Sequence, residues 1–388
     1  MVKILVLDGR SLASLAIVRS LGEKGFEIHC GEEFRLNLTS FSKYVKKIWV
    51  YPSPELQADE FIKKIKTITL KEKIDMIIPI RDATTLLIAK YANELSHITN
   101  IFVAEFDTIK VLQDKGETLK VARKCGIPYP KTFFPEEMEI ADIIKDLPEP
   151  ALIRARVSSG SRGIAFVANR DTFFEKYNLI KKDYGEPIVQ EYVKKRSYCS
   201  VCLLLDKHSN EVASFTYEKT KEYPQSGGPT VVGYSCNNQK AKNYALQLLK
   251  KVGWQGVAEV EFIIDQQGIP RLLEINPRFW MPLNLAIKSG VDFPYLLYQL
   301  AFGYKTNKIQ DYKIGFKFRW VLPNEILWLL STPNKKQGLK EFITFKEKDT
   351  CYGDLSLEDP LPILGIFAQS MYFLTDKKKR QAFLNRGW

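Results

Sequence analysis

The stretch "GVAEVEFIIDQQGIPRLLEINPR", residues 256–278, alternates apolar and polar residues on both sides of a turn that contains Gly268. Alternation around a glycine turn is typical of a β-hairpin. If Gln267 and Gly268 form a two-residue loop, Glu261 pairs with Glu274 and Glu259 pairs with Asn276. Paired and alternate residues share one face of a sheet, so this face is predicted to carry three carboxylates and an amide.

The other face of this hairpin is predicted to be apolar, with Val260, Phe262, Leu273 and Ile275. Opposed carboxylates repel each other, so the acidic face needs protons, basic partners or a cation. Oxygen ligands of this kind suit Mg²⁺, which proteins usually hold with one or two carboxylates together with substrate phosphates. A solvated acidic face is the alternative, and Arg278 argues against it, because an arginine there can hold a phosphate or an oxyanion beside the metal.

Bulk properties limit the class of protein. The chain has 388 residues, 45% of them hydrophobic, which predicts a globular protein of two or three lobes. The longest apolar stretch, residues 361–374, is shorter than the roughly 18 residues of a membrane-spanning helix. Six scattered cysteines favour a reducing cytoplasm, and no histidine has the spacing of a zinc ligand. The net charge of +12 indicates an anionic partner without choosing among nucleotide, nucleic acid, lipid and polyacid.

The chain before the hairpin is predicted to begin with an α/β lobe over residues 1–106. "VKILVLDG", "DMIIPI" and "NIFVAEF" have the pattern of strands, and helices between them predict a parallel sheet. Gly9 stands alone after the first strand, so the dinucleotide fingerprint G-x-G-x-x-G is missing. Further on, residues 150–169 are predicted to form two strands around a Ser/Gly loop, while the order of residues 311–388 stays open.

The hairpin with "EINPR" resembles the metal-binding end of the ATP-grasp superfamily, in particular its carboxylate–amine ligase branch. The resemblance implies a pre-ATP-grasp α/β domain over 1–106. It further implies a two-lobed ATP-grasp fold with antiparallel sheets over 107–310, whose lid subdomain spans about 150–195. Residues 311–388 would be an extension that completes the ligase. In this family pattern Glu261, Glu274 and Asn276 hold Mg²⁺ or Mn²⁺, Glu259 assists from behind them, and Arg278 is catalytic.

The same resemblance implies a site for ATP. Lys115 and Arg154 would contact phosphates, and the loop "SSGSRG" would close over them with the residues Ser159, Gly160, Ser161, Arg162 and Gly163. Backbone N–H groups of such a loop can form an anion-binding nest. The strand end "QEYV" would meet the adenine through Glu191, Tyr192 and Val193, with Tyr198 near the ribose. Each of these segments also has a purely structural interpretation: a solvated lysine, an ordinary hairpin turn or an edge strand.

Two departures from the family pattern bear on nucleotide use. Arg154 stands where a lysine is usual, and Tyr198 stands where many members have a glutamate. Arginine keeps the charge but is larger and planar, so the exchange is not neutral. On the substrate side, Lys219 or Lys221 would touch a phosphate or a substrate carboxylate.

The implied activity is that of an ATP-dependent ligase that joins a carboxylate to an amine through an acyl phosphate and releases ADP and phosphate. Alternatives are another acceptor (bicarbonate, a thiol or a hydroxyl) and a non-catalytic nucleotide-binding protein. The short run "DKKKR", residues 376–380, suggests nucleic-acid binding as a further alternative. A solvated helix face explains this run as well, so no nucleic-acid partner is expected. The expected partners are a small carboxylate, acidic or peptide-like, and an amine. Family members are often dimers, which leaves a homodimer open.

Overall fold

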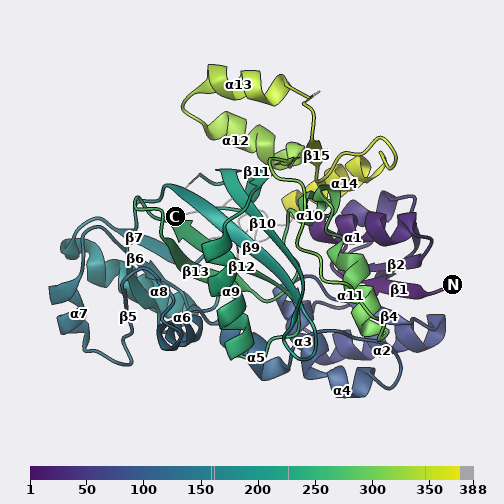
Figure 1. Ribbon diagram of the computed structural model, residues 1–388, viewed down its shortest axis with the longest axis horizontal. Helices are drawn as coiled ribbons and strands as arrows, with labels where there is room; N and C mark the ends of the chain where they lie inside the picture. Colours follow the sequence, from purple (N-terminus) through teal and green to yellow (C-terminus); the bar gives the residue numbers. More distant parts are fainter. Residues whose placement is uncertain (159, 161, 226, 346, 376–388) are drawn as a thin grey trace.

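The computed structural model describes residues 1–375 except 159, 161, 226 and 346. Its N-terminal domain is a parallel sheet in the order β3-β2-β1-β4, covered by helices, as predicted (Figure 1). Ser11 caps the first helix by accepting the Ala13 N–H, and the apolar strand β1 is buried. The elements are β1 (Lys3–Val6), α1 (Leu12–Glu23), β2 (Glu27–Glu32), η1 (Leu38–Phe41), β3 (Val45–Val50), α2 (Ala58–Glu72), β4 (Met76–Ile78), α3 (Asp82–Lys90) and α4 (Ala92–Leu95).

The expected strand "NIFVAEF" does not form. Asn100 makes only a bridge to Met76, and the next helix starts at Phe106. The segment instead runs along the start of a strand of the central sheet, where the Gln255 side chain donates to the Val103 carbonyl at 2.6 Å. A side-chain donor thus satisfies a carbonyl that a strand would have paired within a sheet.

A small lobe lies on the left in Figure 1 and consists of an antiparallel sheet in the order β5-β8-β6-β7. It begins earlier in the chain than the expected lid at about residue 150. Its elements are β5 (Thr132–Phe133), α7 (Ile140–Asp146), β6 (Ala151–Arg154), β7 (Ile164–Val167), η2 (Arg170–Thr172), α8 (Phe173–Tyr184) and β8 (Ile188–Glu191).

The central sheet runs in the order β13-β12-β9-β10-β11-β14-β15 and is antiparallel apart from the β14–β15 pair. The last two strands come from the C-terminal part of the chain, whose helices α12 and α13 project at the top of Figure 1. The elements are α5 (Phe106–Gln113), α6 (Lys115–Lys124), β9 (Ser197–Leu205), β10 (Glu211–Glu222), β11 (Thr230–Ser235), α9 (Gln239–Lys251), β12 (Gly256–Ile264), β13 (Pro270–Asn276), α10 (Leu283–Ser289), α11 (Phe293–Ala301), β14 (Lys317–Arg319), η3 (Val321–Glu325), α12 (Ile326–Ser331), α13 (Lys335–Ile343), β15 (Thr350–Tyr352) and α14 (Pro362–Thr375).

The hairpin of β12 and β13 has the predicted pairs at its open end but a different turn. Ile264 pairs with Pro270, so the loop is longer than the predicted two residues. A bulge at Leu273 then shifts the register by one residue and restores the pair Glu261–Glu274. The prediction that Leu273 lies on the apolar face is therefore wrong: Leu272 occupies the core, and Leu273 lines a cavity.

One hydrophobic core joins the N-terminal domain to the central sheet. Leu15 of α1 and Phe215 of β10 belong to it, together with Trp280, which directly follows the hairpin and is fully buried. This shared core fixes the end of β13 against the N-terminal domain. Among the described helices, none combines the length and the apolar character needed to cross a lipid bilayer.

Candidate active site

The polar face of the hairpin is a connected network. The Asn276 side-chain amide donates to Glu259 and to Glu261, both at 2.9 Å, and its oxygen accepts from Arg278 at 3.0 Å. The Tyr217 hydroxyl of β10 donates to Glu259 at 2.6 Å across the intervening strand β9. The structure thus brings the predicted acidic residues and Arg278 together in one place.

Glu274 faces two cations. Arg154 of β6 donates to its carboxylate at 3.0 Å, and the Lys115 ammonium lies 3.5 Å away. Gln190 holds Arg154 in position by accepting from its other terminal nitrogen at 3.0 Å. Burial opposes ionisation of Glu274, but the charges of Lys115 and Arg154 outweigh it and lower the pKa of this carboxyl group. Glu274 is therefore charged at neutral pH and links the hairpin to the small lobe.

The pKa of Glu259 is shifted in the opposite direction to that of Glu274. It is 4% exposed, and burial together with the nearby charge of Glu261 raises its pKa to about 7. Glu261 has the Lys219 ammonium 3.4 Å away. Two carboxylates of the face, Glu261 and Glu274, thus have cationic partners, while Glu259 is only partly ionised around neutral pH.

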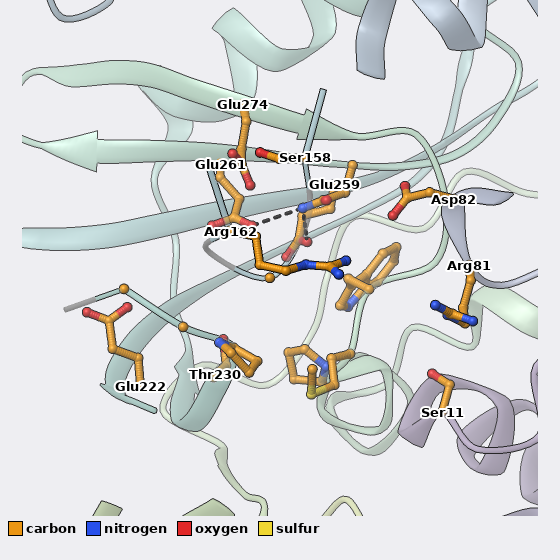
Figure 2. A pocket seen from close by; sticks show the side chains of 18 of the residues that line it. Ser11, Arg81, Asp82, Ser158, Arg162, Glu222, Thr230, Glu259, Glu261 and Glu274 are labelled. Carbon is orange, nitrogen blue, oxygen red and sulfur yellow. Dashed lines mark hydrogen bonds between the residues drawn. The ribbon is translucent and has the colours of Figure 1, made fainter. Parts of the chain in front are cut away.

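Arg278 is oriented by the N-terminal domain. Its Nε donates to Asp82, the first residue of α3, at 2.9 Å, and another nitrogen donates to the Phe279 carbonyl. Figure 2 shows Asp82 and Arg81 across from the cluster of Glu259, Glu261 and Glu274, with the Arg162 side chain between them. Residues of two domains therefore border one space.

That space is a cavity of about 870 Å³, large for a small-molecule site. Its walls come from the small lobe, the central sheet, the N-terminal domain and α14. Arg10 and Arg81 in the N-terminal wall were not named as site residues from the sequence, although Arg81 lies within residues 80–85, which were expected to help choose the substrates. Each comes a few residues after a strand of a parallel sheet, β1 or β4, and the region outside such strand ends is where α/β sheets bind ligands. That rule could have found both.

The loop between β6 and β7 reaches the same cavity. Ser158, Gly160 and Arg162 line it, whereas Ser159 and Ser161 lie outside the described residues. Gly163 has a φ of +66°, and a Cβ there would come within 2.6 Å of the Ala155 side chain. Glycine is therefore required where this loop returns to β7.

The strand end that was predicted to meet adenine also lines the cavity. Glu191, Tyr192 and Val193 border it, and so does Tyr198. The Glu191 carboxylate accepts the Lys131 N–H at 2.8 Å, so its side chain fixes the strand end. Beside Tyr198, sequence reasoning missed two residues that also line the cavity, Lys195 and Glu222, which form a 2.7 Å ion pair.

The two candidate substrate lysines are separated. Lys219 lines the cavity, but Lys221 pairs with Glu341 at 2.8 Å and lies over the Trp328 ring, and it is not among the cavity residues. Two register irregularities in the β10–β11 pair, one between Lys219 and Lys221 and one after Lys221, break the alternation that would keep both on one face. We therefore keep only Lys219 in the proposed site.

A buried acid behind the N-terminal wall makes stability depend on pH. Burial raises the pKa of Glu32 to about 7, so the folded state binds this proton more tightly than the unfolded state does. Protonation of Glu32 therefore stabilises the folded state fully below pH 4.5, and this stabilisation is lost as the pH rises through 7. The loss of unfolding free energy amounts to about 2–3 kcal/mol between pH 5 and 8. Glu32→Gln is expected to remove that part of the decline.

The measurement is the free energy of unfolding of both proteins at pH 5 and pH 8, by denaturant titration. Glutamine lacks one of the acceptors for the Arg10 and Glu33 N–H groups, a cost that is the same at both pH values. The informative quantity is therefore the change between the two pH values. An equal decline in variant and wild type would contradict the assignment.

The comparison with known protein families agrees with the site described above. Residues 112–282 match the model of the ATP-grasp domain. This part of the chain is therefore an ATP-grasp domain, as its hairpin and loop predicted, which indicates an ATP-dependent enzyme. The order of a parallel N-terminal domain followed by antiparallel sheets is the architecture of biotin carboxylases.

Two proteins with similar sequences are carboxylases. The chain is 28% identical over 235 residues to pyruvate carboxylase of Aspergillus terreus, an alignment that covers 55% of this chain and 19% of that protein. It is 24% identical over 245 residues to the mitochondrial propionyl-CoA carboxylase alpha chain of Caenorhabditis briggsae, covering 57% of this chain and 32% of the relative. The chain thus spans a third or less of these relatives.

Two solved structures share the fold at low identity. One is the biotin carboxylase domain dimer of Hydrogenobacter thermophilus 2-oxoglutarate carboxylase, in complex with MgADP, ADP and bicarbonate (TM-score 0.66, 18% identity, 81% of this chain and 73% of that one). The other is N5-carboxyaminoimidazole synthetase of Staphylococcus aureus (TM-score 0.63, 14% identity, 81% and 80%).

The hairpin fits a hard divalent cation. Across the described part of the chain, no three His, Cys, Asp or Glu side chains are grouped to hold a metal by themselves. The chain offers the carboxylates of Glu261 and Glu274 and the amide oxygen of Asn276, and Mg²⁺ commonly completes such a partial set with substrate phosphates and water. The Asn276 oxygen now accepts from Arg278, so its amide has to turn to present that oxygen to a cation.

Proposed function

We propose that this protein is an ADP-forming ligase that activates a carboxylate with ATP and joins it to an amine. The observation that carries the proposal is the single cavity in which Glu261, Glu274 and Asn276 meet the cationic groups of Lys115, Arg154, Lys219 and Arg278. Phosphoryl transfer needs positioning and charge neutralisation more than a nucleophilic side chain. Such a cavity supplies both.

The reaction has two steps. A carboxylate oxygen of the substrate attacks the γ-phosphorus of ATP, the bond from that phosphorus to the β–γ bridging oxygen breaks, and ADP leaves. The amine nitrogen then attacks the carbonyl carbon of the acyl phosphate, phosphate departs with the electron pair of the broken C–O bond, and the nitrogen loses a proton. An amide bond, ADP and phosphate are the products.

Each residue has a role that its position supports. Lys115 and Arg154, together with Gly160 and Arg162 of the loop, neutralise the phosphates, while the strand end at Glu191–Val193 borders the base and Tyr198 the ribose. Glu261, Glu274 and Asn276 hold Mg²⁺, which when bound supplies positive charge to the phosphate oxygens. Gly163 and Tyr192 were also predicted to belong to the nucleotide site, as were Ser159 and Ser161, which lie outside the described residues.

On the side of the reacting carbonyl, Arg278 stabilises the negative charge that develops on its oxygen, and Asp82 keeps that guanidinium in place. Lys219 lies 3.4 Å from Glu261 in the same cavity and can contact a phosphate or the substrate carboxylate. Neither residue needs to gain or lose a proton for these roles.

The N-terminal end of the cavity is suited to the amine substrate. There Arg10 pairs with Glu33 at 2.8 Å and Arg81 approaches Glu55 at 3.4 Å, so cationic and anionic groups alternate. A substrate that carries both charges, as an amino acid does, can exchange with either kind of partner. We therefore place the amine at this end and the activated carboxylate between it and ATP.

A second candidate keeps the same chemistry with bicarbonate as the carboxylate, so that the amine becomes a carbamate. The likeness to carboxylases, one of them solved with bicarbonate, favours it. Both candidates transfer one oxygen of the activated carboxylate to phosphate, which separates them from a protein that only binds nucleotide.

The test uses that oxygen. Mg-ATP is incubated with pools of amines and either ¹⁸O-labelled carboxylic acids or ¹⁸O-bicarbonate, and released phosphate is examined by mass spectrometry. We expect ¹⁸O in phosphate, and Arg278→Ala is expected to lower its rate of formation by about 10²–10³-fold. The matched control is Arg123→Ala, which removes an exposed arginine of α6 that pairs with Glu137. Its rate of labelled phosphate formation should equal that of wild type. Phosphate release without label from any donor would exclude carboxylate activation.

A further inference from the structure

One part of the cavity wall carries no charged side chain. Among the described residues that line the cavity, none after Arg278 in the chain is charged, although 26% of the whole chain consists of charged residues. These uncharged lining residues come from the loop after β13, from residues 320–324 and from α14. This side of the cavity therefore differs in chemistry from the side that carries the hairpin.

Large apolar side chains form much of this uncharged side. Six of the side chains that line the cavity belong to the hydrophobic core shared by the N-terminal domain and the central sheet, or pack against it. We call them the apolar wall: Leu12, Trp280, Met281, Trp320, Leu322 and Ile366. Met281, Trp320 and Leu322 are only half-buried, so they present apolar surface to the cavity.

Hydrogen bonds behind the apolar wall hold it in place. The backbone N–H of Trp320 donates to the Val231 carbonyl at 2.8 Å, and its indole N–H donates to the Leu322 carbonyl at 2.7 Å. The buried carboxyl group of Asp354 accepts the Leu322 N–H at 2.6 Å. Because the polar groups of this segment are bonded within the protein, the surface that remains for a ligand is apolar.

The apolar wall lies away from the carboxylates of the hairpin. Its Trp320 donates to the β11 residue that directly follows Thr230, and its Leu12 directly follows Ser11. Figure 2 shows Thr230 and Ser11 on the side of the pocket away from Glu274. The apolar wall therefore adjoins the N-terminal end of the cavity.

We propose that the apolar wall binds a large apolar side chain of the amine substrate, so that the amine is an amino acid with an aromatic or branched aliphatic side chain. This inference rests on the proposed function, which places the amine at the N-terminal end of the cavity. Burying an apolar group against this wall is favourable in proportion to the area removed from water. A charged side chain would lose its hydration there and gain no counter-charge from the wall.

The other reactants have their places elsewhere in the cavity. The phosphates and the base of ATP are assigned to Lys115, Arg154 and the strand end at Glu191–Val193. The activated carboxylate has to reach the γ-phosphate and so lies near Lys219 and Arg278. The cavity volume of about 870 Å³ is near the upper end for small-molecule sites, which leaves room for an amine with a large side chain.

The first test measures binding without turnover. The full chain is saturated with Mg²⁺ and a non-hydrolysable ATP analogue and is then titrated calorimetrically with glycine, alanine, leucine, phenylalanine and glutamate. We expect leucine or phenylalanine to bind at least about tenfold more tightly than alanine, as is typical when an apolar pocket gains a methylene group or more. Glutamate, which brings a charge to the apolar wall, is expected to bind more weakly than leucine.

Two substitutions test the apolar wall itself. Met281→Lys exchanges one unbranched side chain for another of similar length and places a charge in the wall. We expect it to lower the affinity for the preferred amino acid by about tenfold or more, and that for glycine, which has no side chain, by less than about threefold. Leu322→Asn should act in the same way, and circular dichroism checks that both variants are folded. The matched control is Met138→Lys, at an exposed methionine that is not among the described cavity residues, and it should bind like wild type.

Release of ¹⁸O-labelled phosphate separates this inference from the proposed function. Labelled phosphate formed equally well with alanine and phenylalanine would overturn the role of the apolar wall and leave the ligase standing. Tighter binding of phenylalanine that is lost in Met281→Lys, without labelled phosphate from any donor, would support the wall and reject the ligase. No binding of any of the five amino acids would overturn the inference. A changed preference among carboxylates and not among amines, in both wall variants, would assign the wall to the donor instead.

Discussion

Glu274→Gln is expected to slow the release of ADP from Mg-ATP by about 10²–10³-fold, the loss typical of removing one preorganised electrostatic contact. Glutamine has nearly the same shape, so Arg154 can keep a hydrogen bond to the remaining oxygen. The charge, however, disappears from the point where Lys115, Arg154 and the opposing Glu261 converge. The variant tests electrostatics at this position with little change in packing.

Two consequences follow from this arrangement. Lys115 and Arg154 would lose their anionic partner and bind phosphates in altered positions, and Mg²⁺ would lose one of its two carboxylates. We expect a lower turnover number together with a higher Mg²⁺ requirement. Glu60→Gln, on the exposed surface of α2, is the control and should match wild type. Turnover within threefold of wild type in Glu274→Gln, at any Mg²⁺ concentration, would remove Glu274 from the site.

Glu325→Ala is expected to destabilise the protein by about 3–5 kcal/mol, because it leaves a buried guanidinium without its counter-charge. Arg319 is 0% exposed and donates to Glu325 at 2.9 Å. Its other nitrogens donate to the carbonyls of Phe342, in the last turn of α13, and of Thr344, which follows that helix. This ion pair therefore ties the C-terminal helices to β14 of the central sheet.

Denaturant titration of the free energy of unfolding measures the effect. Glu358→Ala removes an exposed carboxylate from the same part of the chain and should stay within about 0.5 kcal/mol of wild type. The double substitution Arg319→Met/Glu325→Leu removes both charges and should cost less than Glu325→Ala alone. A loss below about 1 kcal/mol for Glu325→Ala would show that water or another anion compensates Arg319.

The acidic face of the hairpin could be predicted from sequence, although the turn could not. The pairs Glu261–Glu274 and Glu259–Asn276 are correct, yet the loop is longer than assumed and the bulge at Leu273 compensates. Alternation of polar and apolar residues specifies which face is buried, and this constraint survives a local insertion. The position of a bulge depends on neighbouring strands, so it leaves no signal in one sequence.

Long-range arrangements were the least predictable part of the fold. The strand β3 and the joining of β14 and β15 to the central sheet went unrecognised, because short, partly polar strands are defined by partners far away in sequence. The separation of Lys219 from Lys221 has the same origin, since it depends on irregular pairing with β11. Anchors such as Gln190 for Arg154 and Asp82 for Arg278 likewise appear only once the lobes are assembled.

The most direct test of the account is a calorimetric titration of the protein with a non-hydrolysable ATP analogue, with Mg²⁺ and with EDTA, in wild type and Glu274→Gln. We predict one binding event per chain in wild type that is strengthened by Mg²⁺, and loss of that Mg²⁺ effect in the variant. No binding of the nucleotide by wild type, or the same Mg²⁺ effect in both proteins, would contradict the assignment of the hairpin as the metal and phosphate end of an ATP site.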